Sequence, residues 1–110
     1  MWLNDNNYKD YLKGITVVEV SGESCANCLT LMPILDSLIS ERNDCKLYHI
    51  EAQDDSKEFI EKFEIKTIPT ILVLYDLDII ASCRGYQPEE ILELWLDSKI
   101  EDIKLKYNFK

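Results

Sequence analysis

The sequence predicts an α/β fold in which helices cover both faces of one central mixed β-sheet. Three observations support this prediction. The 110-residue chain alternates strand-like and helix-like stretches, 46% of its residues are hydrophobic, and it contains no internal repeat or linker rich in Pro, Gly or Ser. Because that length and composition suffice for one core, we expect a single domain over residues 1–110. Three layers, helix on sheet on helix, are the economical packing for this alternation.

Four segments have the composition of strands. Residues 15–22 are rich in β-branched side chains, and residues 45–52 form a second such stretch. Residues 70–75 are almost entirely apolar, which is typical of a central strand covered on both faces. Residues 79–86 follow after a connection of hairpin length, so the last two strands are expected to be antiparallel neighbours.

The remaining segments have helical spacing. Residues 26–41 place Leu29, Met32, Leu35, Leu38 and Ile39 at helical intervals, with Pro33 inside the segment. Further helices are expected over residues 54–63, which would bury Phe59, Ile60 and Phe63, and over residues 87–97, with Ile91, Leu92, Trp95 and Leu96 facing inward. Residues 98–110 are expected to extend the last helix, and residues 1–12 are expected to form an N-terminal helix.

The charge balance narrows the range of partners. The chain carries 21 acidic and 12 basic residues, a net charge of -9, and the basic residues are scattered. Nucleic acids and anionic membranes attract a basic footprint, so neither is an expected partner. No apolar run approaches the roughly 18 residues of a membrane span, and the N-terminus lacks the pattern of a signal peptide. We therefore expect a monomer in the cytoplasm, where thiols stay reduced.

A pair of cysteines separated by two residues is the feature that most directly suggests chemistry. Cys25 and Cys28 lie where the first long strand passes into a helix, whereas Cys45 and Cys83 stand alone. Unpaired N–H groups and the dipole at a helix N-terminus stabilise a thiolate at Cys25, and the thiolate is the nucleophile in disulfide exchange. Cys28, one turn further along, is within reach of a disulfide to Cys25.

Two other interpretations of the pair are open. A tetrahedral zinc site usually needs two close pairs of ligands, and this chain offers no second pair and a single histidine, His49. A buried structural pair is the other alternative, although core cysteines rarely lie at a strand-to-helix turn. Both fit the position less well than a redox pair.

Further landmarks make the sequence resemble the thioredoxin family over roughly residues 15–96. Pro33 matches the proline inside the active-site helix of that family, and Pro69, in "TIPT", matches its cis-proline. Gly85 matches the glycine that lines the family's substrate groove. The resemblance implies a thioredoxin-like fold and a thiol-disulfide oxidoreductase that reduces protein disulfides. It implies no cofactor beyond the Cys25–Cys28 couple, and an electron donor of the thioredoxin-reductase type.

The resemblance also assigns roles to individual residues. Cys25 attacks the target disulfide, Cys28 resolves the mixed disulfide, and Glu19, where the family carries a buried carboxylate, accepts the Cys28 proton. The backbone of Ile68, before Pro69, pairs with an extended substrate segment. Arg84 and Gly85 complete the substrate groove.

The sequence departs from the usual family pattern at three places. Ser24 stands where a tryptophan precedes the nucleophile, Ala26 and Asn27 replace the Gly-Pro between the cysteines, and Arg84 occupies a position that is usually apolar. The residues between the cysteines set the reduction potential, so the direction of exchange is open at this point. The alternative function is a binding or adaptor module on the same fold, with no redox turnover.

Overall fold

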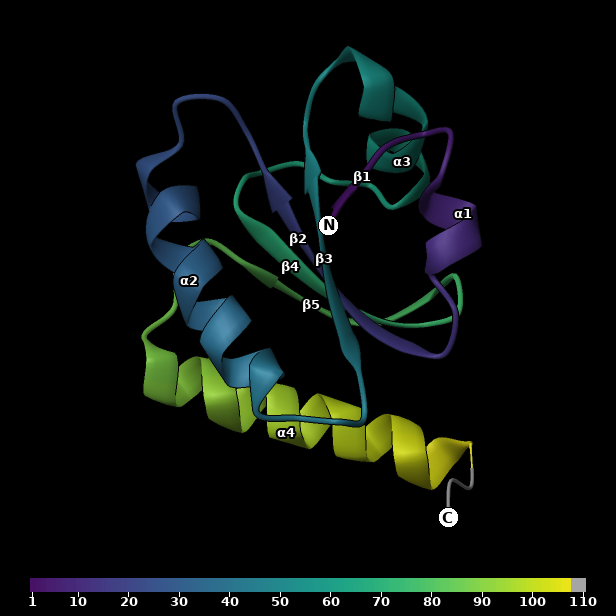
Figure 1. Cartoon of the computed structure of the whole chain (residues 1–110), viewed down its shortest axis with the longest axis vertical. Coiled ribbons are helices and arrows are strands. Elements are labelled where there is room, and N and C mark those ends of the chain that lie inside the picture. The colour runs from purple at the N-terminus through teal and green to yellow at the C-terminus, as the bar shows by residue number, and fades with distance from the viewer. Residues whose placement is uncertain (108–110) are drawn as a thin grey trace.

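The computed structural model describes residues 1–107 and contains one five-stranded sheet flanked by helices (Figure 1). The strands are β1 (Trp2–Leu3), β2 (Ile15–Ser21), β3 (Lys46–Glu51), β4 (Thr70–Tyr75) and β5 (Asp78–Arg84). Their order across the sheet is β1-β3-β2-β4-β5. Strand β3 is parallel to β1 and β2, whereas β4 is antiparallel to β2 and β5, so the sheet is mixed as expected.

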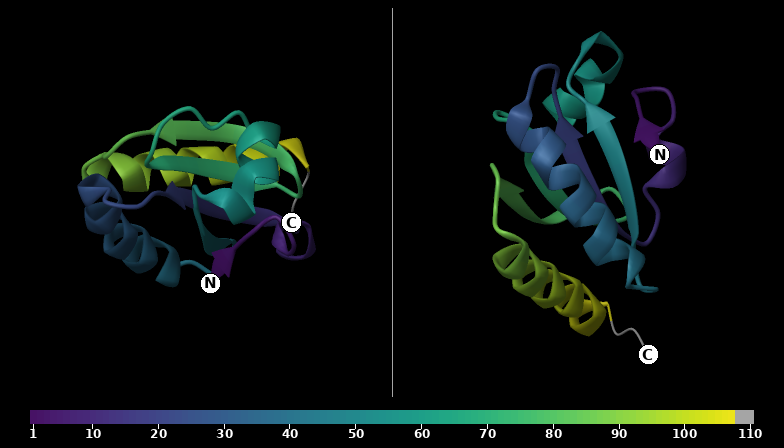
Figure 2. Two further views of the ribbon diagram at one scale, coloured as in Figure 1. Left: turned by 90° about the horizontal axis from the view of Figure 1, so that it is seen from above. Right: turned by 60° about the vertical axis from the view of Figure 1, so that its left-hand side comes forward.

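The helices cover both faces of this sheet. They are α1 (Tyr8–Tyr11), α2 (Ala26–Ser40), the 3-10 turn η1 (Asp54–Ser56), α3 (Lys57–Lys62) and α4 (Glu89–Lys106). Helices α2 and α4 lie on one side of the sheet, and α1 and α3 lie on the other (Figures 1 and 2). The prediction of three layers with a central mixed sheet is therefore confirmed.

Strand β2 is the centre of the molecule and is buried along its whole length. Val17 packs with the apolar side chains of α2 and α4, while Val18 and Val20 pack with those of α1 and α3. Because side chains alternate along a strand, Glu19 and Ser21 project to the same side as Val17, which is the side of α2. The strand that precedes the cysteine pair thus carries two polar side chains into the layer beneath the active-site helix.

The N-terminus differs from the sequence-based expectation. Trp2 and Leu3 form a short strand paired with His49 and Ile50, and the helix after them covers only Tyr8–Tyr11. The prediction of one helix over residues 1–12 was wrong in its first part. Leu3 and Tyr8 are buried in the core on the α3 side, so packing against the sheet determines the conformation of this segment.

Two helix positions expected in the core are exposed. Leu29 is 72% exposed and Ile91 is 54% exposed, because α2 and α4 present Leu31 and Leu92 to the sheet instead. Their other predicted apolar positions lie on the buried faces or at their margins. Helix α4 ends at Lys106, so the predicted extension is confirmed that far, and residues 108–110 lie outside the described part of the chain. Within residues 1–107, no helix is long and apolar enough to cross a membrane.

Candidate active site

The two cysteines lie at the N-terminus of α2 and are bonded to each other. Cys25 is the N-cap residue, and its Cα lies 5.2 Å from that of Cys28 within the disulfide. The backbone N–H of Cys28 donates to the Cys25 sulfur across 3.2 Å. This donor, with the positive end of the helix dipole, stabilises negative charge on that sulfur when the bond is reduced.

The two sulfurs differ in accessibility. Cys25 is half-buried, whereas Cys28 is 2% exposed. An external disulfide can approach the half-buried Cys25, while the buried Cys28 is shielded from it. This difference fits an attacking and a resolving cysteine.

A cavity of about 310 Å³ opens beside the disulfide. Both cysteines line it together with Trp2, Ser21, Ser24 and Met32. Ser24, immediately before Cys25, leaves this space open where the family pattern carries a tryptophan. Trp2 reaches the cavity from the N-terminal strand, a contribution that sequence reasoning missed because it placed that residue in a helix.

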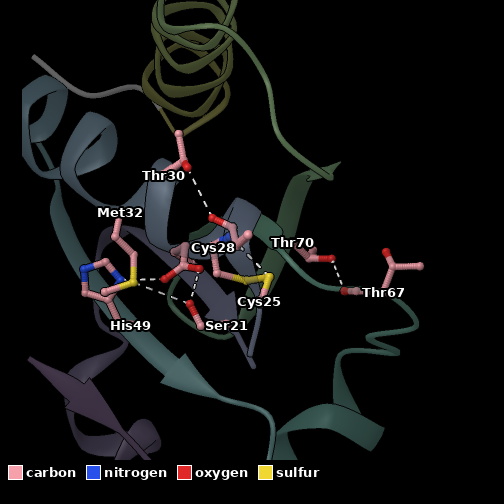
Figure 3. Close-up of a disulfide and its surroundings, with 10 residues drawn as sticks. Ser21, Cys25, Cys28, Thr30, Met32, His49, Thr67 and Thr70 are labelled. Atoms are coloured by element: carbon pink, nitrogen blue, oxygen red, sulfur yellow. Dashed lines mark hydrogen bonds and ion pairs between the residues drawn. A yellow bond between two sulfur atoms is a disulfide. The ribbon is translucent and has the colours of Figure 1, made fainter. Parts of the chain in front are cut away.

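A second segment lies beside the cysteines and contains two of the predicted substrate-binding residues. The Ile68–Pro69 peptide bond is cis, and the Thr70 hydroxyl donates to the Thr67 carbonyl oxygen across 2.7 Å to close the turn around it. Figure 3 shows Thr67 and Thr70 on one side of the disulfide, with Ser21, Met32 and His49 on the other. Ile68 is 39% exposed, so this residue lies at the surface.

Gly22 allows that segment to approach. A Cβ atom built on Gly22 would collide with Cδ1 of Ile68, so the side chain of Ile68 occupies the space that a side chain at Gly22 would need. This contact joins the loop before Cys25 to the turn at Pro69. No role in the site was predicted for Gly22.

The other two predicted groove residues lie at the end of β5. The Gly85 N–H donates to the Pro69 carbonyl oxygen across 2.8 Å, and Gly85 has a φ of 78°, in the left-handed region that favours glycine. Arg84 pairs with Thr70 across the sheet and has an exposed side chain. The structure thus brings Ile68, Pro69, Arg84 and Gly85 together along one edge.

Glu19 lies fully buried in a polar network on the α2 side of the sheet. Its Oε1 is 2.7 Å from Nδ1 of His49, and the Ser21 hydroxyl donates to its Oε2. Nε2 of His49 lies 3.3 Å from Oδ1 of Asp36 on α2. Burial disfavours the charged imidazole, but the hydrogen bonds and charges of Glu19 and Asp36 outweigh that effect and raise the pKa of His49.

From the sequence, His49 was expected only as a conceivable zinc ligand, and no role was predicted for Ser21 or Asp36. Glu19 and His49 are direct partners in the parallel pairing of β2 with β3. The sequence does show a polar residue in each of two buried strands, and this signal could have suggested a pair. It does not show the register of the two strands, which decides whether the two residues are neighbours. Within residues 1–107 no group of three or more His, Cys, Asp or Glu side chains has the arrangement of a metal site.

The fold and the paired cysteines define a thiol-disulfide oxidoreductase. The sequence model of the family described as Thioredoxin matches residues 1–98. The chain belongs to the thioredoxin family.

Individual relatives agree with this assignment. The thioredoxin of Bacillus subtilis (strain 168) is 29% identical over 82 residues, an alignment that covers 74% of this chain and 78% of the relative. The thioredoxin of Chlamydia pneumoniae is 28% identical over 91 residues, covering 82% and 88%. The crystal structure of Chlamydomonas reinhardtii thioredoxin f2 matches with a TM-score of 0.78 and 22% identity, covers 89% of this chain and 94% of that one, and supports the fold.

Proposed function

We propose that this oxidoreductase works as a reductase of protein disulfides, with Cys25 as nucleophile and Cys28 as resolving thiol. The observation that carries the proposal is the asymmetry of the pair: Cys25 caps α2 and is half-buried, while Cys28 is 2% exposed. The Cys25 thiolate attacks one sulfur of the substrate disulfide, and the other sulfur leaves with the bonding electrons. Cys28 then attacks Cys25, forms the internal disulfide and releases the second substrate thiol.

Glu19 is proposed as the acceptor of the Cys28 proton. Its carboxylate is buried on the side of the sheet that faces α2, and Ser21, which donates to it, lines the cavity beside the cysteines. A thiol must lose its proton before it attacks, and a buried carboxylate is a suitable base at that position. Glu19 would thus be the first group to receive the proton that Cys28 loses.

Ile68, Pro69, Arg84 and Gly85 are proposed to hold the substrate segment. The backbone of Ile68 would pair with an extended chain, and Arg84 would attract acidic groups near the substrate disulfide. This proposal is supported by the exposure of Ile68 and Arg84 and by the hydrogen bond between Gly85 and Pro69. Replacing Arg84 with Gln should raise KM for a protein substrate with acidic residues beside its disulfide and leave kcat nearly unchanged.

The setting is proposed from the family and from the charge of the chain. A dithiol reductase of the thioredoxin-reductase type would reduce the internal disulfide again, and no cofactor besides the cysteine pair would be needed. We propose a single-domain monomer that acts in the cytoplasm and binds neither nucleic acid nor membranes, which is consistent with a net charge of -9.

Reduction of insulin disulfides by dithiothreitol, followed by turbidity, tests the reductase function. The wild type should accelerate the reaction and Cys25→Ser should not, while Cys45→Ser, which removes a thiol outside the pair, should retain the wild-type rate. Equal rates for the wild type and Cys25→Ser would contradict the proposal and would favour the adaptor alternative. Equilibration with glutathione buffers gives the direction, because a reductase requires a reducing potential.

A further inference from the structure

A set of polar contacts leads from the cavity beside the cysteine pair to the surface of the protein. It begins at Ser21, which lines the cavity together with both cysteines. The Ser21 hydroxyl donates a hydrogen bond to Glu19. From Glu19 it continues to Nδ1 of His49, 2.7 Å away, and from Nε2 of His49 to Asp36, 3.3 Å away. The side chains of Glu19 and His49 are 0% and 8% exposed, whereas that of Asp36 is 62% exposed.

These contacts raise the question of where the Cys28 proton goes after Glu19. A fully buried carboxylate has no direct contact with solvent, so the charge that the Cys28 proton brings to Glu19 reaches water only through the groups that contact Glu19. His49 is such a group, because its imidazolium holds a proton on both ring nitrogens and can release the one on Nε2 while Nδ1–H stays bonded to Glu19. Its two nitrogens lie against Glu19 on one side and Asp36 on the other.

We propose that His49 and Asp36 form a proton route that connects Glu19 to solvent during disulfide exchange. This inference rests on the proposed function, since it takes Glu19 as the acceptor of the Cys28 proton. His49 and Asp36 touch neither sulfur and act through Glu19, so they are relay and positioning residues rather than catalytic ones.

The proton balance of the route closes over one turnover. In the resolving step the Cys28 S–H bond breaks and its proton passes to Glu19. The electron pair left on the Cys28 sulfur forms the new bond to the Cys25 sulfur as the substrate thiolate leaves. Nδ1–H of the His49 imidazolium stays bonded to Oε1 of Glu19, while the Nε2–H bond breaks and that proton passes to Asp36 and then to water. One proton therefore enters the network at Glu19 and one leaves it at Nε2.

Reduction of the internal disulfide reverses the route. An external dithiol attacks Cys25, and Cys28 leaves as a thiolate that takes the proton from Glu19, while Nε2 of His49 regains a proton from water through Asp36. Each turnover therefore restores the Glu19 carboxylate and the His49 imidazolium. The substrate thiolate and the external dithiol exchange their own protons with water.

The surroundings of His49 fit a relay. The charged groups that contact it are Glu19 from β2 and Asp36 from α2, while the group contributed by β1 is the Trp2 ring, whose centroid is 5.4 Å from that of the imidazole. The indole covers the imidazole without contributing a titratable group. The elevated pKa of His49 keeps the imidazole able to carry a proton at neutral pH.

The resolving step can be isolated by reacting the reduced protein with dithiobis(nitrobenzoate) in a stopped-flow instrument. Cys25 releases one coloured thiolate in a phase that depends on reagent concentration, and attack by Cys28 releases the second in a phase that does not. Any reaction of Cys45 or Cys83 is bimolecular and is recognised by its dependence on reagent concentration.

The proposal predicts that His49→Gln and Asp36→Asn slow the second phase about tenfold, a fraction of the 10²–10⁴-fold typical of general acid–base catalysis, because water replaces the relay only in part. Both should also change the pH profile of that phase and reduce its solvent deuterium isotope effect. Asp102→Asn removes a carboxylate from an exposed position on α4 and should change nothing. Asp36 is exposed, so its replacement by the isosteric Asn leaves the fold intact, which the thermal midpoint verifies.

The outcomes separate this inference from the proposed function. If Glu19→Gln slows the second phase while His49→Gln and Asp36→Asn leave its rate, pH profile and isotope effect unchanged, Glu19 remains the base and the relay is wrong. If Glu19→Gln also has no effect, the proposed role of Glu19 fails. A slower phase in His49→Gln with an unchanged pH profile would also overturn the relay, since it would indicate a purely structural role.

Discussion

The side chain of Ile68 lies in the space that a side chain on Gly22 would occupy. This relationship connects two loops that are far apart in the sequence, the one that carries Cys25 and the one that carries the cis peptide bond of Ile68 and Pro69. The absence of a Cβ at Gly22 thus sets how closely the proposed substrate-binding turn approaches the nucleophile.

Replacing Gly22 with Ala should therefore impair activity more than stability. The collision involves Cδ1, the far end of a side chain that is 39% exposed, so Ile68 can move at a cost of about 1 kcal/mol. Its movement displaces the proposed substrate-binding backbone, and we expect kcat/KM for insulin to fall roughly tenfold, as small misplacements at reacting groups do.

The double variant Gly22→Ala, Ile68→Ala is the control for this explanation. If the collision causes the loss of activity, Gly22→Ala should lower kcat/KM for insulin by a smaller factor when Ile68 is already Ala, and a double-mutant cycle in kcat/KM measures the difference. Equal factors in both backgrounds would contradict it.

The stability of the protein should depend on pH through His49. The contacts of His49 with Glu19 and Asp36 raise its pKa above the ordinary 6.5, so the protonated form is favoured by folding. This stabilisation is complete below about pH 6.5, the pKa expected in the unfolded chain, and disappears as the pH rises through the higher folded value. The unfolding free energy of the wild type relative to His49→Gln should therefore be larger at acidic than at alkaline pH.

Urea unfolding at several pH values measures this difference. The sequence contains one histidine, so no other imidazole contributes to the comparison. A difference between wild type and variant that grows with increasing pH would have the wrong sign and would refute the assignment.

The local signals of the sequence predicted most of the fold and the cysteine site. The β-branched run before Cys25, the helical spacing after it and the apolar segment 70–75 each determine their structure through their own composition, and they fall on β2, α2 and β4. Glu19 was placed correctly as a buried side chain for the same reason, because a strand covered on both faces leaves neither side in solvent.

What the sequence did not reveal depends on contacts between distant segments. The pairing of Glu19 with His49 requires the register of two parallel strands, and no local pattern specifies that register. Trp2 and Leu3 form a strand too short to show a period of two, so only their pairing with β3 defines them. The role of Gly22 could not be predicted from a local pattern, because the side chain that it contacts belongs to Ile68, far along the chain.

A cluster of ion pairs connects the loop after α2 with helix α4. Arg42 bonds to Asp44 across 2.9 Å and also to Asp97, and Lys104 reaches Asp44 across 2.5 Å. Hydrogen bonds from Arg42 and Lys104 lower the pKa of Asp44 although burial opposes the shift. The contribution is therefore complete above the ordinary carboxyl pKa and is lost as the pH falls below it toward the lowered pKa of the folded state.

We expect Asp44→Asn to lower the unfolding free energy by about 1–2 kcal/mol at neutral pH, since the pairs are partly buried and share one carboxylate. Asp54→Asn is the matched control, because its pair with Lys57 is exposed and spans 3.8 Å. Urea unfolding should show no measurable change in that control, and the loss in Asp44→Asn should shrink at acidic pH. An equal loss in both variants would argue against the cluster.

The two cysteines outside the pair should be unreactive. Burial, followed by the charge of Asp44, raises the pKa of Cys45 to about 11, and burial raises the pKa of Cys83. Because the thiolate is the reactive form, a brief exposure of the reduced protein to iodoacetamide at neutral pH should label Cys25 and leave Cys45 and Cys83 unmodified. Peptide mass spectrometry identifies the labelled cysteines.

The variant Asp44→Asn removes the charge next to Cys45 and should increase labelling of Cys45 but not of Cys83. Early labelling of Cys45 in the wild type would contradict the prediction, because it would assign this thiol a reactivity that its environment does not support.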